Sequence, residues 1–150
     1  MTKSCEGCSR RAVLQGIGIT AIGTLLLGSC QQAGSNLPTA TSTTCGSDTC
    51  IDLGDTNNSD LASVGGAMIV DLATDTVVVI RTGDATVTVL SDVCTHAGCT
   101  MDYNASTKQL DCPCHGSVFS LDGKVVTGPA NRPVKVYAAT MASNTITITG

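Results

Sequence analysis

Short apolar runs recur through the second half of the chain, separated by polar turn residues. Five such runs, rich in Val, Ile, Thr and Ala, lie at residues 67–72, 76–82, 85–91, 133–139 and 144–150. At 86–89 and 145–148, apolar and polar residues alternate with a period of two, as half-buried strands require. Gly, Asp and Asn occupy the joins between runs, and no helical stripe follows residue 30. The pattern predicts an all-β domain, a small antiparallel sandwich or barrel, over residues 65–150.

The first thirty residues follow a different pattern. A basic start, with Arg10 and Arg11, precedes an uncharged stretch at 12–28 that is shorter than the ~20 apolar residues of a membrane-spanning helix. This arrangement is typical of an export signal. The residues around Arg10 and Arg11 resemble a twin-arginine signal, and we therefore expect a signal peptide over 1–29. The alternative is an uncleaved helix that keeps the domain at the membrane.

The end of this signal is followed by a polar segment. Leu-Gly-Ser-Cys at 27–30 resembles a lipobox, which would make Cys30 the lipidated first residue of a bacterial lipoprotein. Residues 31–44 are Thr-rich and lack apolar periodicity, the composition of a flexible linker. We assign residues 30–64 to the lipidated Cys and a tether, whose 14 polar residues would reach roughly 20 Å.

Composition and charge exclude some classes of function. A chain of 150 residues allows one domain, and its three aromatic residues cannot form a base-stacking platform. The formal net charge is −4; after Cys30, eleven Asp face five Lys and Arg, a balance of −6. This acidity argues against a nucleic-acid partner.

Two clusters of cysteine and histidine interrupt the strand pattern, Cys-Thr-His-Ala-Gly-Cys at 94–99 and Cys-Pro-Cys-His-Gly-Ser at 112–117. Each contains a Cys and a His that could reach a shared metal centre. Two Cys and two His could hold one tetrahedral zinc, so a non-redox zinc-binding interaction domain is one alternative. A four-ligand site would leave Cys99 and Cys114 over, and in an exported protein such a pair indicates a disulfide.

The clusters resemble the Rieske iron-sulfur family, whose pattern is Cys-x-His followed by Cys-x-x-His. They are most similar to its disulfide-containing branch, found in cytochrome bc and bf complexes and in the arsenite oxidase small subunit. The similarity covers 93–119 and extends to Gly128-Pro129-Ala130, which is similar to the family's proline loop. The resemblance implies a Rieske-type sandwich with a cluster-binding hairpin subdomain and one [2Fe-2S] cluster per chain. It implies that Cys94 and Cys112 bind one iron, that His96 and His115 bind the other, and that Cys99 is bonded to Cys114.

Neighbouring residues are expected to set the reduction potential. Two imidazoles in place of two thiolates raise the potential of such clusters to about −150 to +300 mV. The resemblance implies that the Ser117 hydroxyl bonds a bridging sulfide. Many high-potential members have Tyr at the position of Phe119, which cannot donate a hydrogen bond, so we expect a potential in the middle or lower part of the range. Ala97 stands where quinol-oxidising bc subunits often have Leu, a departure from that group.

The remaining cysteines fit an oxidising compartment. Cys45 and Cys50 lie close in sequence without a His partner, so a local disulfide is the preferred interpretation. Cys5 and Cys8 would leave with the signal.

These observations predict a protein of the bacterial cell envelope, exported by the twin-arginine route. It would transfer single electrons as a membrane-anchored carrier or redox-complex subunit. Expected partners are a redox donor or acceptor, such as a cytochrome or quinol-oxidising complex, and the membrane, through a lipid anchor or retained helix. We expect no independent catalysis or oxygenase activity, because neither a nucleophile with its base nor further His ligands remain. Two specific alternatives are the Rieske subunit of a quinol-oxidising cytochrome bc complex and the small subunit of an arsenite-oxidase-type molybdoenzyme.

Overall fold

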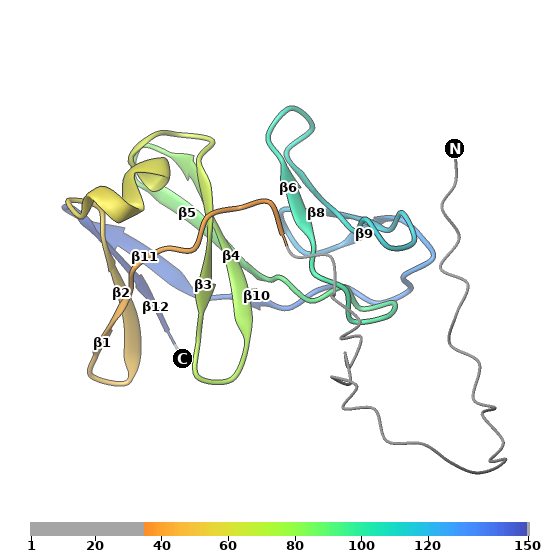
Figure 1. Cartoon of the computed structure of the whole chain (residues 1–150), viewed down its shortest axis with the longest axis horizontal. Helices are drawn as coiled ribbons and strands as arrows, with labels where there is room; N and C mark the ends of the chain where they lie inside the picture. The colour runs from red at the N-terminus through yellow and green to blue at the C-terminus, as the bar shows by residue number, and fades with distance from the viewer. Residues whose placement is uncertain (1–34, 150) are drawn as a thin grey trace, which may run out of the picture. The chain divides into compact units, whose positions relative to one another are not determined.

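Three antiparallel sheets build the part of the chain that the computed structural model describes, residues 35–149 (Figure 1). Their strand orders are β1-β2-β12-β11, β10-β5-β4-β3 and β6-β7-β8-β9. The strands are β1 (Thr43–Cys45), β2 (Asp48–Asp52), β3 (Ala67–Asp71), β4 (Thr76–Gly83), β5 (Thr86–Ser91), β6 (Asp102–Asn104), β7 (Gln109–Asp111), β8 (Val118–Ser120), β9 (Val125–Thr127), β10 (Val136–Tyr137), β11 (Ala139–Ala142) and β12 (Thr145–Ile148). The predicted all-β architecture is confirmed.

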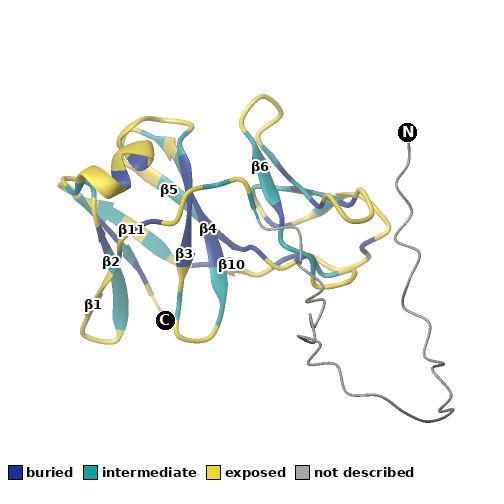
Figure 2. Cartoon of the chain, viewed as in Figure 1, coloured by how far each residue is buried: buried dark blue, intermediate teal, exposed yellow. Residues whose placement is uncertain are grey.

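The sheet that contains β4 is buried on both of its faces, as the dark central strands of Figure 2 show. Val77 and Val79 pack into one core with Ile146 of β12. The next side chains along the strand point the other way, and Val78 packs into a second core with Phe119 of β8. β4 is therefore apolar along most of its length because both faces of its sheet are covered. The sheet that contains β12 covers one face, and the subdomain of β6–β9 covers the other.

Part of the segment expected to be a tether belongs to this fold. β2 pairs with the final strand β12, with Ile51 opposite Ile146, and both side chains are fully buried. A 3-10 helix, η1 (Thr56–Ala62), follows, and the Asp55 carboxylate accepts the Asn57 amide at its start. The assignment of 30–64 to a tether was therefore wrong for residues 43–62, which form β1, β2 and η1. The polar strands β1 and β2 gave no apolar signal because backbone pairing holds them in place, β1 with β2 and β2 with β12.

Residues 35–41 also lie against the folded domain. The Asn36 amide donates to the Asp102 carboxylate of β6 at 2.8 Å, and the Ala40 amide donates to the Ile69 carbonyl of β3 at 2.8 Å. The buried Asn58 side chain accepts the Thr41 amide and donates to the Thr41 carbonyl. This stretch therefore links the subdomain of β6–β9 to η1, and only four residues separate Ser35 from Cys30 in the sequence.

The remaining N-terminal predictions lie outside the described residues. They concern the signal peptide at 1–29, the twin arginines Arg10 and Arg11, and lipidation of Cys30. Within residues 35–149, no helix has the length and apolar character needed to cross a bilayer.

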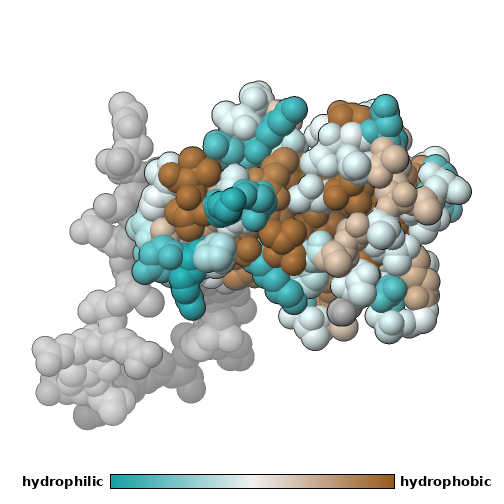
Figure 3. Space-filling model, turned by 180° about the vertical axis from the view of Figure 1, so that it is seen from behind, coloured by the Kyte–Doolittle hydropathy of each residue, from teal (hydrophilic) through white to brown (hydrophobic). Residues whose placement is uncertain are grey.

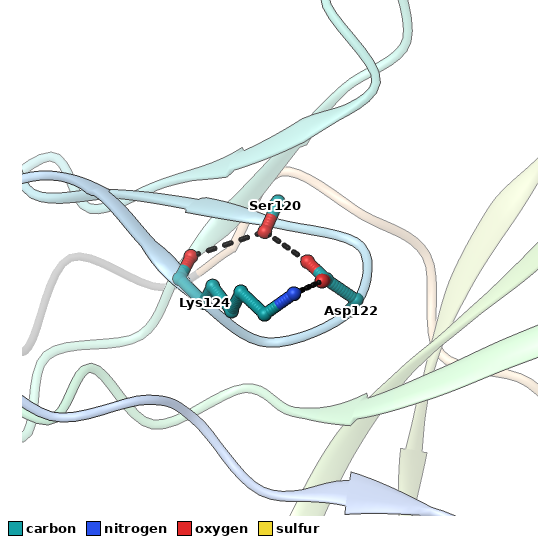
Figure 4. A network of polar contacts seen from close by, with 3 residues as sticks. All are labelled: Ser120, Asp122 and Lys124. Carbon is teal, nitrogen blue, oxygen red and sulfur yellow. Dashed lines mark hydrogen bonds and ion pairs between the residues drawn. The ribbon is translucent and has the colours of Figure 1, made fainter.

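The hairpin between β8 and β9 is closed by a small polar network (Figure 4). The Ser120 hydroxyl contacts the Asp122 carboxylate, and the Lys124 ammonium lies 2.6 Å from the same carboxylate. Lys124, followed by Ser120, lowers the pKa of Asp122 to about 2. This is the only ion pair among residues 35–149, so the other Lys and Arg side chains in that range have no carboxylate partner of this kind.

Candidate metal centre

Two loops of similar construction carry the Cys and His residues. The first begins at Cys94 after β5, and the second begins at Cys112 after β7. In each loop a glycine amide donates back to the carbonyl of the first Cys, from Gly98 at 2.8 Å and from Gly116 at 3.0 Å. Both glycines have positive φ, 74° and 75°, a conformation that side-chain-bearing residues rarely adopt. These glycines therefore allow each loop to turn tightly around its cysteine.

A disulfide holds the two loops together. Cys99 is bonded to Cys114 with 6.5 Å between their Cα atoms, which confirms the predicted pair. Cys45 and Cys50 form a second disulfide across the β1–β2 hairpin, as expected. The two disulfides have different roles, because only Cys99–Cys114 joins the loops that carry His96 and His115.

The first cysteines of the two loops remain unbridged and lie at the base of the site. Cys94 is 1% exposed and Cys112 is 2% exposed, and both belong to the core that contains Phe119. Burial raises the pKa of the Cys112 thiol, and the adjacent Cys94 thiol raises it further. Two buried thiols side by side, in a protein that has oxidised its other described cysteines, suit a soft metal centre.

The two imidazoles form the outer part of the site. His96 and His115 are both exposed, with ring centroids 4.8 Å apart and an edge-to-face angle of 84°. The donors are therefore arranged as one buried sulfur pair and one exposed nitrogen pair. That division fits a [2Fe-2S] cluster with two Cys on one iron and two His on the other.

The grouping of the donors, with the thiols together and the imidazoles together, also bears on the zinc alternative. Among the described residues, no three His, Cys, Asp or Glu side chains converge to hold a single metal ion. A structural zinc site would need four ligands around one point. The donors are grouped two and two instead.

Ser117 and the segment 128–130 lie together beneath the second loop. The Ala130 amide donates to the Ser117 hydroxyl oxygen at 3.0 Å, and both residues are buried. The preceding peptide, Gly128-Pro129, is cis. Phe119 is fully buried, lies opposite Leu110 of β7 and packs in the core that contains both unbridged thiols.

Several residues that support the site were not anticipated from the sequence. The Thr95 hydroxyl donates to the Arg132 carbonyl at 2.7 Å and so joins the first loop to the segment after Pro129. The buried Asp92 carboxylate accepts the Met101 amide at 2.9 Å on the opposite side of that loop. Burial raises the pKa of Asp92, and the Met101 bond acts in the other direction. These contacts join residues distant in sequence and have no local motif.

The Rieske [2Fe-2S] domain family matches residues 55–138 of the chain. A curated relative, the cytochrome b6-f complex iron-sulfur subunit of Gloeobacter violaceus, is 35% identical over 98 residues, which are 58% of this chain and 50% of that protein. The chain spans about a third to a half of the length of the curated relatives it matches.

Solved structures give the same result. The cyanobacterial plasma membrane Rieske protein of Synechocystis PCC 6803 is 29% identical, with a TM-score of 0.57 over 67% of this chain and 99% of that chain. The ferredoxin of carbazole 1,9a-dioxygenase from Nocardioides aromaticivorans IC177 is 26% identical, with a TM-score of 0.51 over 58% of this chain and 86% of that chain. The chain belongs to the Rieske [2Fe-2S] domain family, and its cofactor is a [2Fe-2S] cluster.

Proposed function

We propose that this protein transfers single electrons outside the cytoplasm, next to a membrane, with a [2Fe-2S] cluster held by Cys94, Cys112, His96 and His115. The observation that carries the proposal is the division of these four donors into a buried thiol pair and an exposed imidazole pair at the same pair of loops. When bound, the cluster supplies reversible one-electron chemistry.

The chain's own residues place and protect that chemistry. The thiols are buried in an apolar core, which keeps water from the sulfur side. The imidazoles are exposed, so a partner can approach on their side. The Ser117 oxygen already accepts the Ala130 amide, so its own hydroxyl proton is available for donation toward the cysteine and sulfide sulfurs.

Two features support an oxidising location at a membrane. Disulfides such as Cys45–Cys50 and Cys99–Cys114 persist outside the cytoplasm and are rare within it. The signal-like sequence around Arg10 and Arg11, followed by Cys30, supports twin-arginine export and a lipid anchor. With Cys30 lipidated, five residue steps to Ser35 would span at most about 18 Å, which is shorter than the tether expected from composition alone.

The partner that the relatives favour is a quinol-oxidising complex of the cytochrome bc type. The Gloeobacter violaceus relative is a subunit of a cytochrome b6-f complex. A separate membrane-anchored carrier is the second candidate, because the chain aligns with 99% of the Synechocystis plasma membrane Rieske protein. The arsenite-oxidase-type subunit remains an alternative that co-purification with a molybdenum subunit would reveal.

Purification of the full chain tests the cofactor assignment. We expect two irons and two sulfides per chain and a Rieske-type EPR signal after reduction. His96→Ala and His115→Ala should each lose the signal. The double variant Cys45→Ala/Cys50→Ala removes the distant disulfide and should keep it. Iron-free wild-type protein, or an unchanged signal in both histidine variants, contradicts the proposal.

Cell fractionation tests the location. The wild-type protein should fractionate with the membrane and be digested by protease added to spheroplasts. Cys30→Ala should release it into the extracytoplasmic soluble fraction, whereas replacement of Arg10 and Arg11 by Lys should retain it in the cytoplasm. Protection from protease in the wild type contradicts an extracytoplasmic position.

A further inference from the structure

An open groove of about 710 Å³ lies beside the exposed His96. Its walls come from the first Cys–His loop, from the turn between β3 and β4, and from the segment that leads into β10. Its lining includes Asp75, Val93, His96, Arg132 and Lys135. Because His96 itself lines the groove, a molecule seated there would contact a proposed cluster ligand directly.

Both cationic side chains of the groove are available to a partner. Arg132 and Lys135 are exposed and form no ion pair among residues 35–149. The Arg132 backbone is joined to the first loop through the Thr95 hydroxyl at 2.7 Å. The Lys135 ammonium lies 4.0 Å from the centre of the Tyr137 ring, a cation–π contact that orients it.

One carboxylate, that of Asp75, also lines the groove, and it already accepts a hydrogen bond. Asp75 is half-buried and accepts the Tyr137 hydroxyl at 2.6 Å. The loops at 93–101 and 112–121, which carry the two histidines, contain no charged residue. Arg132 and Lys135 therefore give the groove beside His96 a net positive charge.

The charges of the whole domain are divided unevenly along the sequence. Residues 92–136 contain four Asp and four Lys or Arg, a net charge of zero. Residues 35–91 and 137–149 contain seven Asp and one Arg, which accounts for the full balance of −6. Net charge alone would predict a basic partner, but of these seven Asp only Asp75 lines the groove.

Apolar surface accompanies the cations. Val93 is 42% exposed in the groove, and Val136 is 47% exposed on β10 next to Lys135. From behind, brown hydrophobic areas alternate with teal hydrophilic ones over the described part of the molecule (Figure 3). Partly apolar surface with charged residues at its edge is typical of transient protein interfaces.

We propose that this groove is the docking site for a carboxylate-bearing face of the electron-transfer partner, with Arg132 and Lys135 as the recognition residues. The inference rests on the proposed electron-transfer function and specifies the chemistry of the partner. Opposite charges across an interface raise the rate of encounter and fix the orientation of docking. An acidic partner face would therefore be brought against the groove and its His96.

The sign of a salt effect tests this directly. In stopped-flow experiments, hexacyanoferrate(III), an anion, takes one electron from the reduced protein and becomes hexacyanoferrate(II), leaving the cluster oxidised. If the groove governs encounter, raising the ionic strength from about 0.01 M to about 1 M should slow this reaction about threefold, because the Debye length falls from about 30 Å to about 3 Å. If the net charge governs it, salt should accelerate the reaction, and this outcome overturns the proposal.

Two charge-matched variants locate the effect. Arg132→Gln/Lys135→Gln and Lys108→Gln/Lys124→Gln each remove two positive charges from the chain. Only the first should abolish the slowing by salt and reduce the low-salt rate severalfold. Equal behaviour of the two variants contradicts a role for the groove. With the cationic oxidant tris(1,10-phenanthroline)cobalt(III), the order should be reversed, and the groove variant should react faster than wild type at low salt.

A redox-inert probe gives a second measurement. Hexacyanocobaltate(III) has the charge and shape of the oxidant but takes no electron, and calorimetry should show that it binds wild type and the Lys108/Lys124 variant but not the groove variant. Failure of the proposed function would appear separately, as a colourless protein without an EPR signal. A coloured protein that binds the anion equally well in all variants overturns only the docking site.

Discussion

The Ser117 hydroxyl oxygen accepts the backbone amide of Ala130 at 3.0 Å, in a position where both residues are buried. This bond fixes the segment after Pro129 against the second Cys–His loop. Ser117→Ala would leave the Ala130 amide without its acceptor, a loss that costs about 1–3 kcal/mol for a buried group. We expect a lower free energy of unfolding in urea and a lower reduction potential. Ser106→Ala, in an exposed turn, should change neither.

Phe119→Tyr tests how the core beneath the site tunes the potential. Phe119 is fully buried in the core that contains Cys94 and Cys112. A hydroxyl that donates to a cysteine sulfur would stabilise the reduced state. A bond stronger by about 1.4 kcal/mol in that state raises a one-electron potential by about 59 mV. Redox titration of the variant should show a rise of this order, and Phe119→Leu should show none; an unchanged midpoint in the Tyr variant contradicts the idea.

The two disulfides offer a matched comparison. Cys99–Cys114 closes a separation of 15 residues and Cys45–Cys50 one of 5, for which loop entropy predicts about 3 and about 2 kcal/mol. Their effects on cluster retention should differ much more. Cys99→Ala/Cys114→Ala should lose visible absorption on warming well before far-UV circular dichroism reports loss of the strands. Cys45→Ala/Cys50→Ala should lose both together, and equal cluster lifetimes would contradict the expected role of the first bond.

Arg81 ties η1 to the β4–β5 hairpin. Its guanidinium donates to the carbonyls of Leu61, Ala62, Gly83 and Asp84 at 2.6–3.3 Å. Arg81→Met keeps much of the apolar stem but removes every donor, and we expect a loss on the order of 2 kcal/mol in urea unfolding. Because the site lies elsewhere, the EPR signal of the folded variant should be unchanged. A stability equal to wild type would show that water replaces the guanidinium at no cost.

Tyr137 should make stability depend on alkaline pH. Burial, followed by the Asp75 carboxylate, raises the pKa of Tyr137. The native state therefore keeps the phenolic proton after the unfolded chain begins to lose it, near pH 10. The contribution of Tyr137 to the free energy of unfolding is complete below that pH and is lost as pH rises above it. The difference in free energy of unfolding between wild type and Tyr137→Phe should be constant from pH 7 to about 9 and shrink at higher pH; a constant difference through pH 11 would contradict the assignment.

The sequence predicted the long strands and the Cys99–Cys114 disulfide, and the reasons for its failures are physical. β3, β4 and β5 have apolar runs because the central sheet is covered on both faces. β6 to β9 have only three residues each, too short for any periodicity to register, and each contributes at most one fully buried side chain, such as Leu110 or Phe119. β1 pairs with β2, and β2 pairs with β12, which is distant in sequence.

In the site, too, local features could be predicted from the sequence and long-range contacts could not. The Cys and His spacing was readable because both loops are short and local. The groove was not, because its cations come from 132–135 and are brought to His96 by tertiary contacts, the Thr95–Arg132 bond and the bond from the Ser91 amide to the Lys135 carbonyl.

The pairing of β2 with β12 has a consequence for the order of assembly. The loops of the metal centre and β6 to β9 all lie within 94–127 and are made as one continuous stretch. The sheet β1-β2-β12-β11, in contrast, pairs Ile51 with Ile146, which are separated by almost the whole domain in sequence. This pairing is non-local and cannot form from neighbouring residues alone. During synthesis the core around Ile51 stays open to water until β12 has been made, so the pairing of β12 with β2 decides when the sandwich is sealed.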